Sequence, residues 1–351
     1  MPGPVITRPR SKTSSSARFI LIILVIAAVA AVRPASLRSQ PSQSQSAPAQ
    51  PPSPAAPPDA QQPSRENGTY VIRKDVDEVV LHATVIDDKQ HIITDLTRGD
   101  FTVLEDGKTQ SIISFHHEDI PVSMGIVIDN SGSMREKRAK VNQAALNLVR
   151  ASNPQDEVFI VNFNDEYYLD QDFTNDLLKL KEALEKINAG GGTALRDALI
   201  ASADHLKKNA RLDRKVIFVV TDGEDNASRE SLENTIKALQ DENGPSVYAI
   251  GILGDEEHPK RAKRALEIIS ERTGGMAFFP KTLDEVDEIS RRIAHDIRSQ
   301  YIIGYKPSTP KSAGGFRAIK VEAKAKGHSK LIVRTKSGYY ARPGPAVVGA
   351  K

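Results

Sequence analysis

The sequence predicts an α/β protein with a doubly wound, mainly parallel sheet that is inserted in, or flanked by, a small β-sandwich. Two patterns favour this fold class. Between residues 121 and 299, apolar strand-like runs alternate with segments of helical periodicity, and this alternation is typical of a parallel sheet covered by helices. On both sides of that region the hydrophobic period falls to two, which indicates antiparallel strands without covering helices.

The α/β region, expected over residues 121–299, contains recurring strand and helix signals. Its strand-like runs are MGIVID, EVFIVNF, KVIFVVTD, SVYAIGI and GMAFFP. Residues of helical spacing follow at about 141–149, 193–206, after Ser228, at 260–273 and up to about 299. Each helix would return the chain for another parallel strand, as a doubly wound sheet requires.

Two flanking segments are expected to supply the sandwich. In residues 65–120, alternate apolar positions form one strand face, and Asp106-Gly107 is a strong hairpin signal within FTVLEDGKTQSIISF. Residues 300–343 contain YIIGY, FRAIKVEAKA and KLIVRT, and residues 344–351 form a tail. Because the ends of a doubly wound domain can lie close together, both segments can join in one sandwich. Two separate β pieces are the alternative.

The first 64 residues have the composition of targeting and linker segments. Basic residues precede an apolar run at 19–32, which is typical of a secretory signal within residues 1–33. The run is shorter than the ~20 residues of a comfortable membrane span, so it is either a cleaved signal peptide or an uncleaved anchor. Residues 34–64, rich in Pro, Ser, Gln and Ala, predict a disordered tether. We therefore expect an exported protein, located in the periplasm or cell envelope or secreted.

Composition excludes several classes of function. The chain of 351 residues contains no cysteine, which removes disulfides, thiolate metal sites and cysteine nucleophiles. For an exported chain this favours a bacterial envelope. The formal net charge is only +3 and no basic block is interleaved with aromatic residues, so a nucleic-acid partner is not expected. Membrane contact is expected only through an uncleaved N-terminal segment, and the oligomeric state is left open.

Three loops of the α/β region carry oxygen ligands. They are residues 129–133 (DNSGS), 190–193 (GGGT) and 221–223 (TDG). In an open α/β sheet, ligands bind outside the carboxyl ends of the strands, so these loops are expected to face one crevice. Each loop alone is explained by helix capping or turn formation. Together they supply two carboxylates and three hydroxyls, the all-oxygen set that hard cations such as Mg²⁺ prefer.

These residues resemble a known family. The stretches DNSGS, GGTAL and VVTDGED are similar to the three segments of the metal-ion-dependent adhesion site of von Willebrand factor A domains, whose first segment reads Asp-x-Ser-x-Ser. The resemblance covers roughly Val122 to Ser299. It implies that hydroxyl oxygens bind Mg²⁺, Mn²⁺ or Ca²⁺ directly, that the carboxylates bind directly or through water, and that a partner's carboxylate completes the shell. The implied metal ligands are Asp129, Ser131, Ser133, Thr193 and Asp222.

The flanking segments resemble a narrower group. The run LTRGDFTVLEDGKTQSIISF, an A domain and then YIIGYKP, FRAIKV and GYYA are similar to exported bacterial proteins described as von Willebrand A-related. This similarity covers nearly everything after the tether. The resemblance does not indicate what such proteins bind.

Rival site chemistries lack essential residues. A haloacid-dehalogenase phosphatase needs a second aspartate where Ser131 stands, and a P-loop needs Gly-Lys-Ser/Thr where Gly192 is followed by Thr193. A serine hydrolase elbow would need a flanking glycine where Asn130 stands. We interpret the RGD tripeptide at 98–100 as a turn before a strand.

The expected function is therefore a non-enzymatic, metal-dependent adhesion or protein-binding module whose protein partner presents an Asp or Glu. An envelope protein with a purely structural metal is the first alternative. Metal-assisted phosphoester hydrolysis at the same crevice is the second. We interpret Glu224 and Asp225, which follow the third loop, as parts of a solvated loop.

Overall fold

The computed structural model describes residues 78–185, 189–254, 259–328 and 330–342, together with two short strands nearer the N-terminus. Those strands, β1 (Arg65–Glu66) and β2 (Thr69–Tyr70), pair antiparallel. The predicted signal or anchor, tether and tail lie outside the described residues. No helix in the described part of the chain combines the length and the apolar character needed to cross a membrane.

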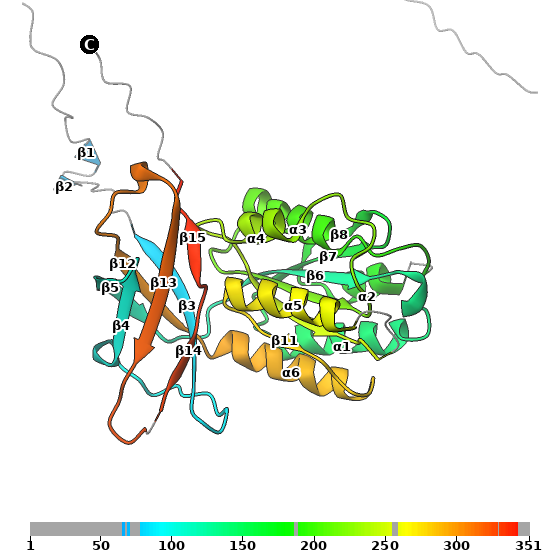
Figure 1. Ribbon diagram of the computed structural model, residues 1–351, viewed down its shortest axis with the longest axis horizontal. Coiled ribbons are helices and arrows are strands. Elements are labelled where there is room, and N and C mark those ends of the chain that lie inside the picture. The colour runs from blue at the N-terminus through cyan, green and yellow to red at the C-terminus, as the bar shows by residue number, and fades with distance from the viewer. Residues whose placement is uncertain are drawn as a thin grey trace, which may run out of the picture. The chain divides into compact units, whose positions relative to one another are not determined.

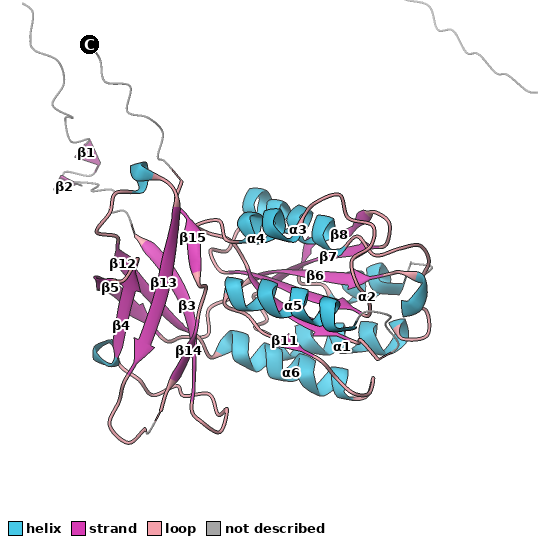
Figure 2. Ribbon diagram, in the orientation of Figure 1, coloured by secondary structure: helices cyan, strands magenta, loops and turns pink. Residues whose placement is uncertain are grey.

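A six-stranded sheet forms the centre of the α/β region, in the order β11-β10-β9-β6-β7-β8 (Figures 1 and 2). The first five strands of this order run parallel and β8 pairs antiparallel with β7. The strands are β6 (Ser123–Asp129), β7 (Glu157–Phe163), β8 (Tyr167–Thr174), β9 (Lys215–Thr221), β10 (Ser246–Gly251) and β11 (Ala277–Phe278). The predicted doubly wound, mainly parallel sheet is confirmed.

Helices cover both faces of this sheet because successive strand residues point to opposite sides. Ile126 and Ile128 pack with one helical layer, whereas Val127 packs with the other. The first layer consists of α1 (Arg138–Ala151), α2 (Leu177–Glu185) and α6 (Glu285–Arg298). The second consists of α3 (Leu195–Asn209), α4 (Leu232–Leu239) and α5 (Pro259–Thr273). Figure 1 shows α3 and α4 across the sheet from α1 and α6.

A second, antiparallel sheet combines strands from both flanking segments. Its order is β14-β3-β12-β5-β4-β13-β15, so strands from before and after the α/β region are interleaved. The strands are β3 (Val79–Ile86), β4 (Phe101–Glu105), β5 (Lys108–His116), β12 (Tyr301–Lys306), β13 (Phe316–Ala323), β14 (Ile332–Arg334) and β15 (Gly338–Tyr340). Short 3-10 turns occur at Arg98–Asp100, Gly132–Met134 and Lys311–Ala313.

This antiparallel part differs from the expected sandwich in one respect. Its strands form a single sheet, and β14 at one edge also lies against β13 near the other edge. Curling allows the sheet to bury its own apolar face, which includes Leu81, Val103 and Ile303. The outer face can then remain polar, as the alternating burial along β13 shows.

Candidate metal centre

The central strands β6 and β9 place two carboxylates side by side. The strands pair in parallel, with Ile128 opposite Val220, so Asp129 ends β6 where Thr221 ends β9 and Asp222 follows. These are the carboxyl ends of the strands, where open α/β sheets bind ligands. Asp129 is 0% exposed and Asp222 is 2% exposed. Two carboxylates buried this closely need cations or hydrogen-bond donors around them.

Hydrogen bonds link four of the five predicted ligands. Asp129 Oδ1 accepts from the Ser131 backbone N–H at 2.8 Å. The Oγ atoms of Ser131 and Ser133 lie 3.2 Å apart, and Ser133 Oγ donates to Asp222 Oδ1 at 2.8 Å. The first and third loops therefore converge through their side chains.

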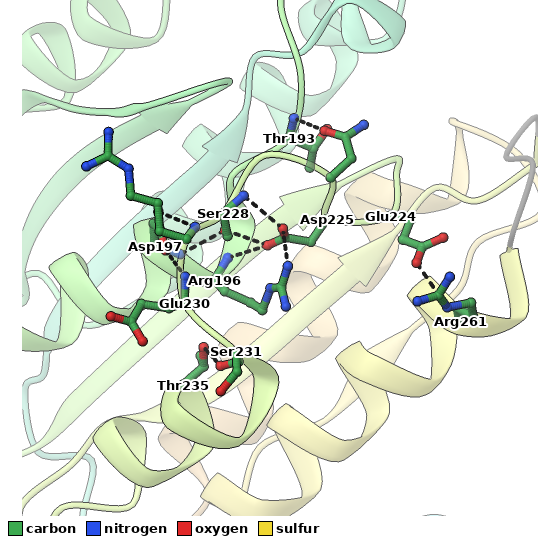
Figure 3. Close-up of polar contacts among 12 residues, drawn as sticks. Thr193, Arg196, Asp197, Glu224, Asp225, Ser228, Glu230, Ser231, Thr235 and Arg261 are labelled. Carbon is green, nitrogen blue, oxygen red and sulfur yellow. Dashed lines mark hydrogen bonds and ion pairs between the residues drawn. The ribbon is translucent and has the colours of Figure 1, made fainter.

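Thr193 reaches this group through its loop. Gly132 N–H donates to Gly191 O at 3.3 Å, and Gly190 N–H donates to Asn130 O at 2.9 Å, so the glycine loop lies against the serine loop. Thr193 itself donates its backbone N–H to Asn226 Oδ1 at 2.8 Å (Figure 3). Among the described contacts, none joins the Thr193 side chain to the other four ligands. The five-ligand set stays a prediction, with Thr193 as its least directly placed member.

Burial changes the acidity of Asp129. Desolvation raises the pKa of its carboxyl to about 6, the nearby charge of Asp222 adds to this rise, and hydrogen bonds from Thr221 and Ser131 oppose it. Thr221 Oγ1 donates to Asp129 Oδ2 at 2.6 Å. A divalent cation would favour the charged form that burial disfavours, so the donor set fits such an ion.

The chemistry of the donors also fits a hard cation. Within the described residues, no group of three or more His, Cys, Asp or Glu side chains could hold a metal. A site here must therefore combine its two carboxylates with hydroxyl oxygens, which Ser131 and Ser133 supply. Ser133 is exposed while Asp129 and Asp222 are buried, so the cluster opens to the surface on its serine side.

Three contributors to the site were not predicted from the sequence. Lys137 Nζ donates to Asp222 Oδ2 at 2.6 Å, Thr221 holds Asp129, and Asn226 holds the backbone of Thr193. Thr221 directly precedes the predicted ligand Asp222. Its position at the end of a strand was the signal that could have placed it in the site. Lys137 lies four residues after Ser133, and one turn of the chain brings residues at this spacing close together. Asn226 lies three residues beyond the third loop and gave no signal in the sequence.

The loop after Asp222 is more ordered than the solvated loop that we expected. Asp225 accepts from Arg196 through both its backbone N–H and its guanidinium, each at 2.7 Å, and from Ser228 Oγ at 2.7 Å. Glu224 forms an ion pair with Arg261 at 3.1 Å. Figure 3 shows both pairs, with the Glu224–Arg261 pair toward the helix that carries Arg261. These carboxylates are partnered by arginines, so they do not add free negative charge to the metal centre.

The RGD tripeptide is part of a turn. Asp100 Oδ2 accepts from the backbone N–H and the hydroxyl of Thr97 at 2.8 and 2.7 Å. The guanidinium of Arg98 donates to Ile112 O. Asp100 is thus used within the turn and Arg98 is used against the neighbouring strand β5, in agreement with the interpretation of the tripeptide as a turn before a strand.

The fold places an oxygen-rich cluster at the tips of β6 and β9 of an α/β domain. Residues 124–224 match the family model of the von Willebrand factor type A domain. The chain therefore contains a von Willebrand factor type A domain, within the α/β region.

Several solved structures are similar to the chain. A von Willebrand factor type A protein from Catenulispora acidiphila shares 14% identity over 77% of this chain and 74% of that one, with a TM-score of 0.45. The PilB minor pilin from Streptococcus sanguinis shares 17% identity over 52% of this chain and 62% of the pilin chain, with a TM-score of 0.41. Proximal thread matrix protein 1 from the mussel byssus, with a zinc-occupied MIDAS motif, shares 18% identity over 55% and 50%, with a TM-score of 0.44. No curated protein matches the chain.

Proposed function

We propose that the chain is an exported, non-enzymatic binding module in which a divalent cation at the tips of β6 and β9 captures a carboxylate of a protein partner. The observation that carries this proposal is the contact of Ser133 Oγ with Asp222 Oδ1 at 2.8 Å. It joins loops 89 residues apart in the sequence. The match of residues 124–224 to the von Willebrand factor type A domain supports the same reading.

Each predicted ligand has a role in this proposal. Asp129 and Asp222 balance the charge of Mg²⁺, Mn²⁺ or Ca²⁺, and Ser131, Ser133 and Thr193 supply neutral oxygens. When bound, the cation supplies a Lewis-acidic centre that attracts an anionic oxygen. The exposed side of the cluster at Ser133 gives an Asp or Glu of the partner access to the cation.

The openness of the site favours binding over a purely structural cation. A purely structural cation is typically enclosed by protein ligands, whereas Ser133 is exposed here. A phosphoester hydrolase of the haloacid-dehalogenase type needs an acid at position 131, where the Ser131 hydroxyl contacts Ser133 Oγ instead. No described feature favours hydrolysis.

Titration calorimetry with Mn²⁺ tests the metal centre first. The full chain is expected to bind one equivalent of Mn²⁺, and Asp129→Ala is expected to abolish this binding because it removes one of two buried charges. Asp213→Ala is the matched control, since it removes an exposed carboxylate before β9, at the other end of the strand. Equal Mn²⁺ binding by wild type and Asp129→Ala would contradict the proposed site.

Partner capture tests the adhesive role. Envelope proteins retained by the immobilised chain in Mg²⁺ should be released by a chelator and should not be retained by Asp129→Ala. A retained protein that survives both treatments argues against a metal-bridged contact. A large drop in melting temperature on chelation, with no partner that depends on the metal, would indicate a structural cation instead.

A further inference from the structure

Lys137 reaches into the candidate metal centre from the start of α1. Its Nζ lies 2.6 Å from Asp222 Oδ2, and its side chain is 16% exposed. The other oxygen of the same carboxylate, Oδ1, accepts from Ser133 Oγ. Asp222 is therefore shared between a predicted metal ligand and an ammonium group.

The local chain geometry directs this lysine to the site. The 3-10 turn at Gly132–Met134 is followed by a hydrogen bond from Lys137 N–H to Met134 O at 2.9 Å. This turn carries Lys137 back beside Ser133. The lysine thus comes from the same short segment as three of the five predicted ligands, and it needs no rearrangement of the fold to reach Asp222.

The neighbouring cation, Arg138, has a different role. Its guanidinium donates to Asp129 O at 3.2 Å, to Asn162 Oδ1 at 3.0 Å and to Leu184 O at 3.2 Å. It is buried among neutral hydrogen-bond acceptors and holds the backbone carbonyl of Asp129 in place. Lys137 is the cation that contacts a ligand carboxylate directly.

The charges of these groups determine what Lys137 does. Asp129, Asp222 and the Lys137 ammonium together carry one net negative charge, so a divalent ion would leave this group with one net positive charge. The Arg138 guanidinium, which interacts electrostatically with Asp129, adds to that positive charge. Affinity for a hard cation follows the number of charged ligands. An ammonium on Asp222 therefore opposes the metal, and the remaining positive charge favours an incoming carboxylate.

We infer that Lys137 is a resident cation of the metal centre, which weakens metal binding and strengthens the capture of a carboxylate by the bound metal. This inference rests on the proposed function. It assigns to one side chain two effects of opposite sign, which a merely structural lysine would not produce.

The test measures Mn²⁺ binding to the full chain from the electron paramagnetic resonance signal of free Mn²⁺, with and without acetate as the simplest carboxylate. Lys137→Met is expected to lower the dissociation constant of Mn²⁺ by about tenfold, because unit charges a few ångströms apart interact strongly near a protein surface. Acetate should tighten Mn²⁺ binding in wild type, and by linkage this tightening reports acetate binding at the metal. The tightening should shrink several-fold in Lys137→Met.

Matched variants distinguish the effect of the Lys137 charge from an effect of the substitution on folding. Lys137→Arg retains the cation and should resemble wild type in both measurements. Lys140→Met removes an exposed lysine on the same helix, which pairs with Asp284, and should change neither. Lys137→Gln provides a second neutral variant if Lys137→Met unfolds, with circular dichroism as the check of folding.

Each outcome bears on one of the two proposals. If neither wild type nor Lys137→Met binds Mn²⁺, the proposed function fails. If both bind Mn²⁺ equally, or if Lys137→Met binds it less tightly, the inference about Lys137 is overturned while the metal centre stands. If only Lys137→Met binds Mn²⁺, the inference is supported and the metal-dependent function of the natural chain is rejected.

Discussion

The Asp129 carboxylate is a buried acid whose two oxygens are each held by a hydrogen bond. Burial raises its pKa, while Thr221 and the Ser131 backbone donate to separate oxygens and keep the group oriented. The carboxylate is thus held in position at an energetic cost that a cation can offset. Its position at the end of β6 makes this possible, because the strand fixes the backbone from which the side chain extends.

The acidity of Asp129 predicts how metal binding depends on pH. Because the pKa is raised to about 6, a proton competes with the metal below that value, and metal affinity should fall about tenfold per pH unit. Above about pH 7 the group is ionised and the dissociation constant of Mn²⁺ should be nearly constant. Calorimetry between pH 5 and 8 measures this profile. A dissociation constant that does not change between pH 7 and 5 would exclude Asp129 as a ligand with this acidity.

Four of the predicted ligands could be placed from the sequence because each lies within a few residues of a strand end. Asp129, Ser131 and Ser133 share one turn, and Asp222 follows the neighbouring strand. Lys137 and Asn226 could not be placed this way. Their contacts depend on how a turn folds back and on how two loops meet, which periodicity does not encode.

Among the structural elements, the hairpin between β4 and β5 shows the closest correspondence between sequence and structure. Asp106 and Gly107 have φ angles of 49° and 76°, the left-handed pair that a two-residue turn requires. Register follows directly, with Glu105 opposite Lys108. Asp-Gly predicted this turn because few other residue pairs adopt it at low cost.

Gly107→Ala is expected to destabilise the protein by about 1 kcal/mol, because a Cβ at positive φ is strained. No heavy atom lies within 4 Å of that Cβ, so steric contact does not contribute. Urea unfolding followed by circular dichroism measures the change in free energy. Gly99→Ala is the control, since its Cβ would meet only Thr97 Oγ1, at an ordinary contact distance of 3.9 Å, and its φ lies outside the left-handed region. Equal stability of the two variants would argue against strain at Gly107.

Two elements, β8 and α2, were absent from the sequence interpretation. The residues of β8 are largely exposed, including Tyr167, Tyr168 and Leu169, each about half exposed. An edge strand of this kind lacks the buried apolar run that identified its neighbours. Helix α2 buries only Leu180, Ala183 and Leu184, so its periodic signal is short. Both elements were missed because they bury few apolar side chains.

At the scale of the whole molecule, a buried chain of polar groups connects the two sheets. Arg214, which precedes β9, donates to Gln300 Oε1 at 2.7 Å. Gln300 Nε2 donates to Tyr248 Oη at 3.0 Å and to Thr84 Oγ1 at 3.2 Å. Thr84 belongs to β3 and Tyr248 to β10. The other two nitrogens of the Arg214 guanidinium, Nε and Nη1, are buried without a hydrogen-bond partner among the described residues, so the contacts of its Nη2 carry the pairing of this buried charge.

Gln300→Ala is therefore expected to lower the free energy of unfolding by about 2–4 kcal/mol, because it leaves the buried guanidinium of Arg214 and the Tyr248 hydroxyl with fewer partners. Denaturant unfolding provides the measurement. Gln155→Ala, at an exposed glutamine, should change stability by less than about 0.5 kcal/mol. A small effect at Gln300 would mean that water or a shifted side chain replaces the lost contacts.

The fold class could be predicted because the spacing of apolar residues changes along the chain, from a period of two to helical spacing and back to two. The single curled sheet could not, because period two marks one buried face and does not distinguish a sheet that curls on itself from two stacked sheets. That choice depends on long-range pairing, such as β3 with β12 and β4 with β13.

The interleaved strand order also determines the order in which the parts of the chain are expected to fold. Tyr305 of β12 hydrogen-bonds to Glu105 of β4 across 200 residues, and bringing such distant segments together is slow and entropically costly. The α/β region shortens that search, because its own folding brings its two ends to neighbouring strands, where Ile302 pairs with His116. The curled sheet should accordingly be the last part to form as the chain emerges, after the α/β region is already complete.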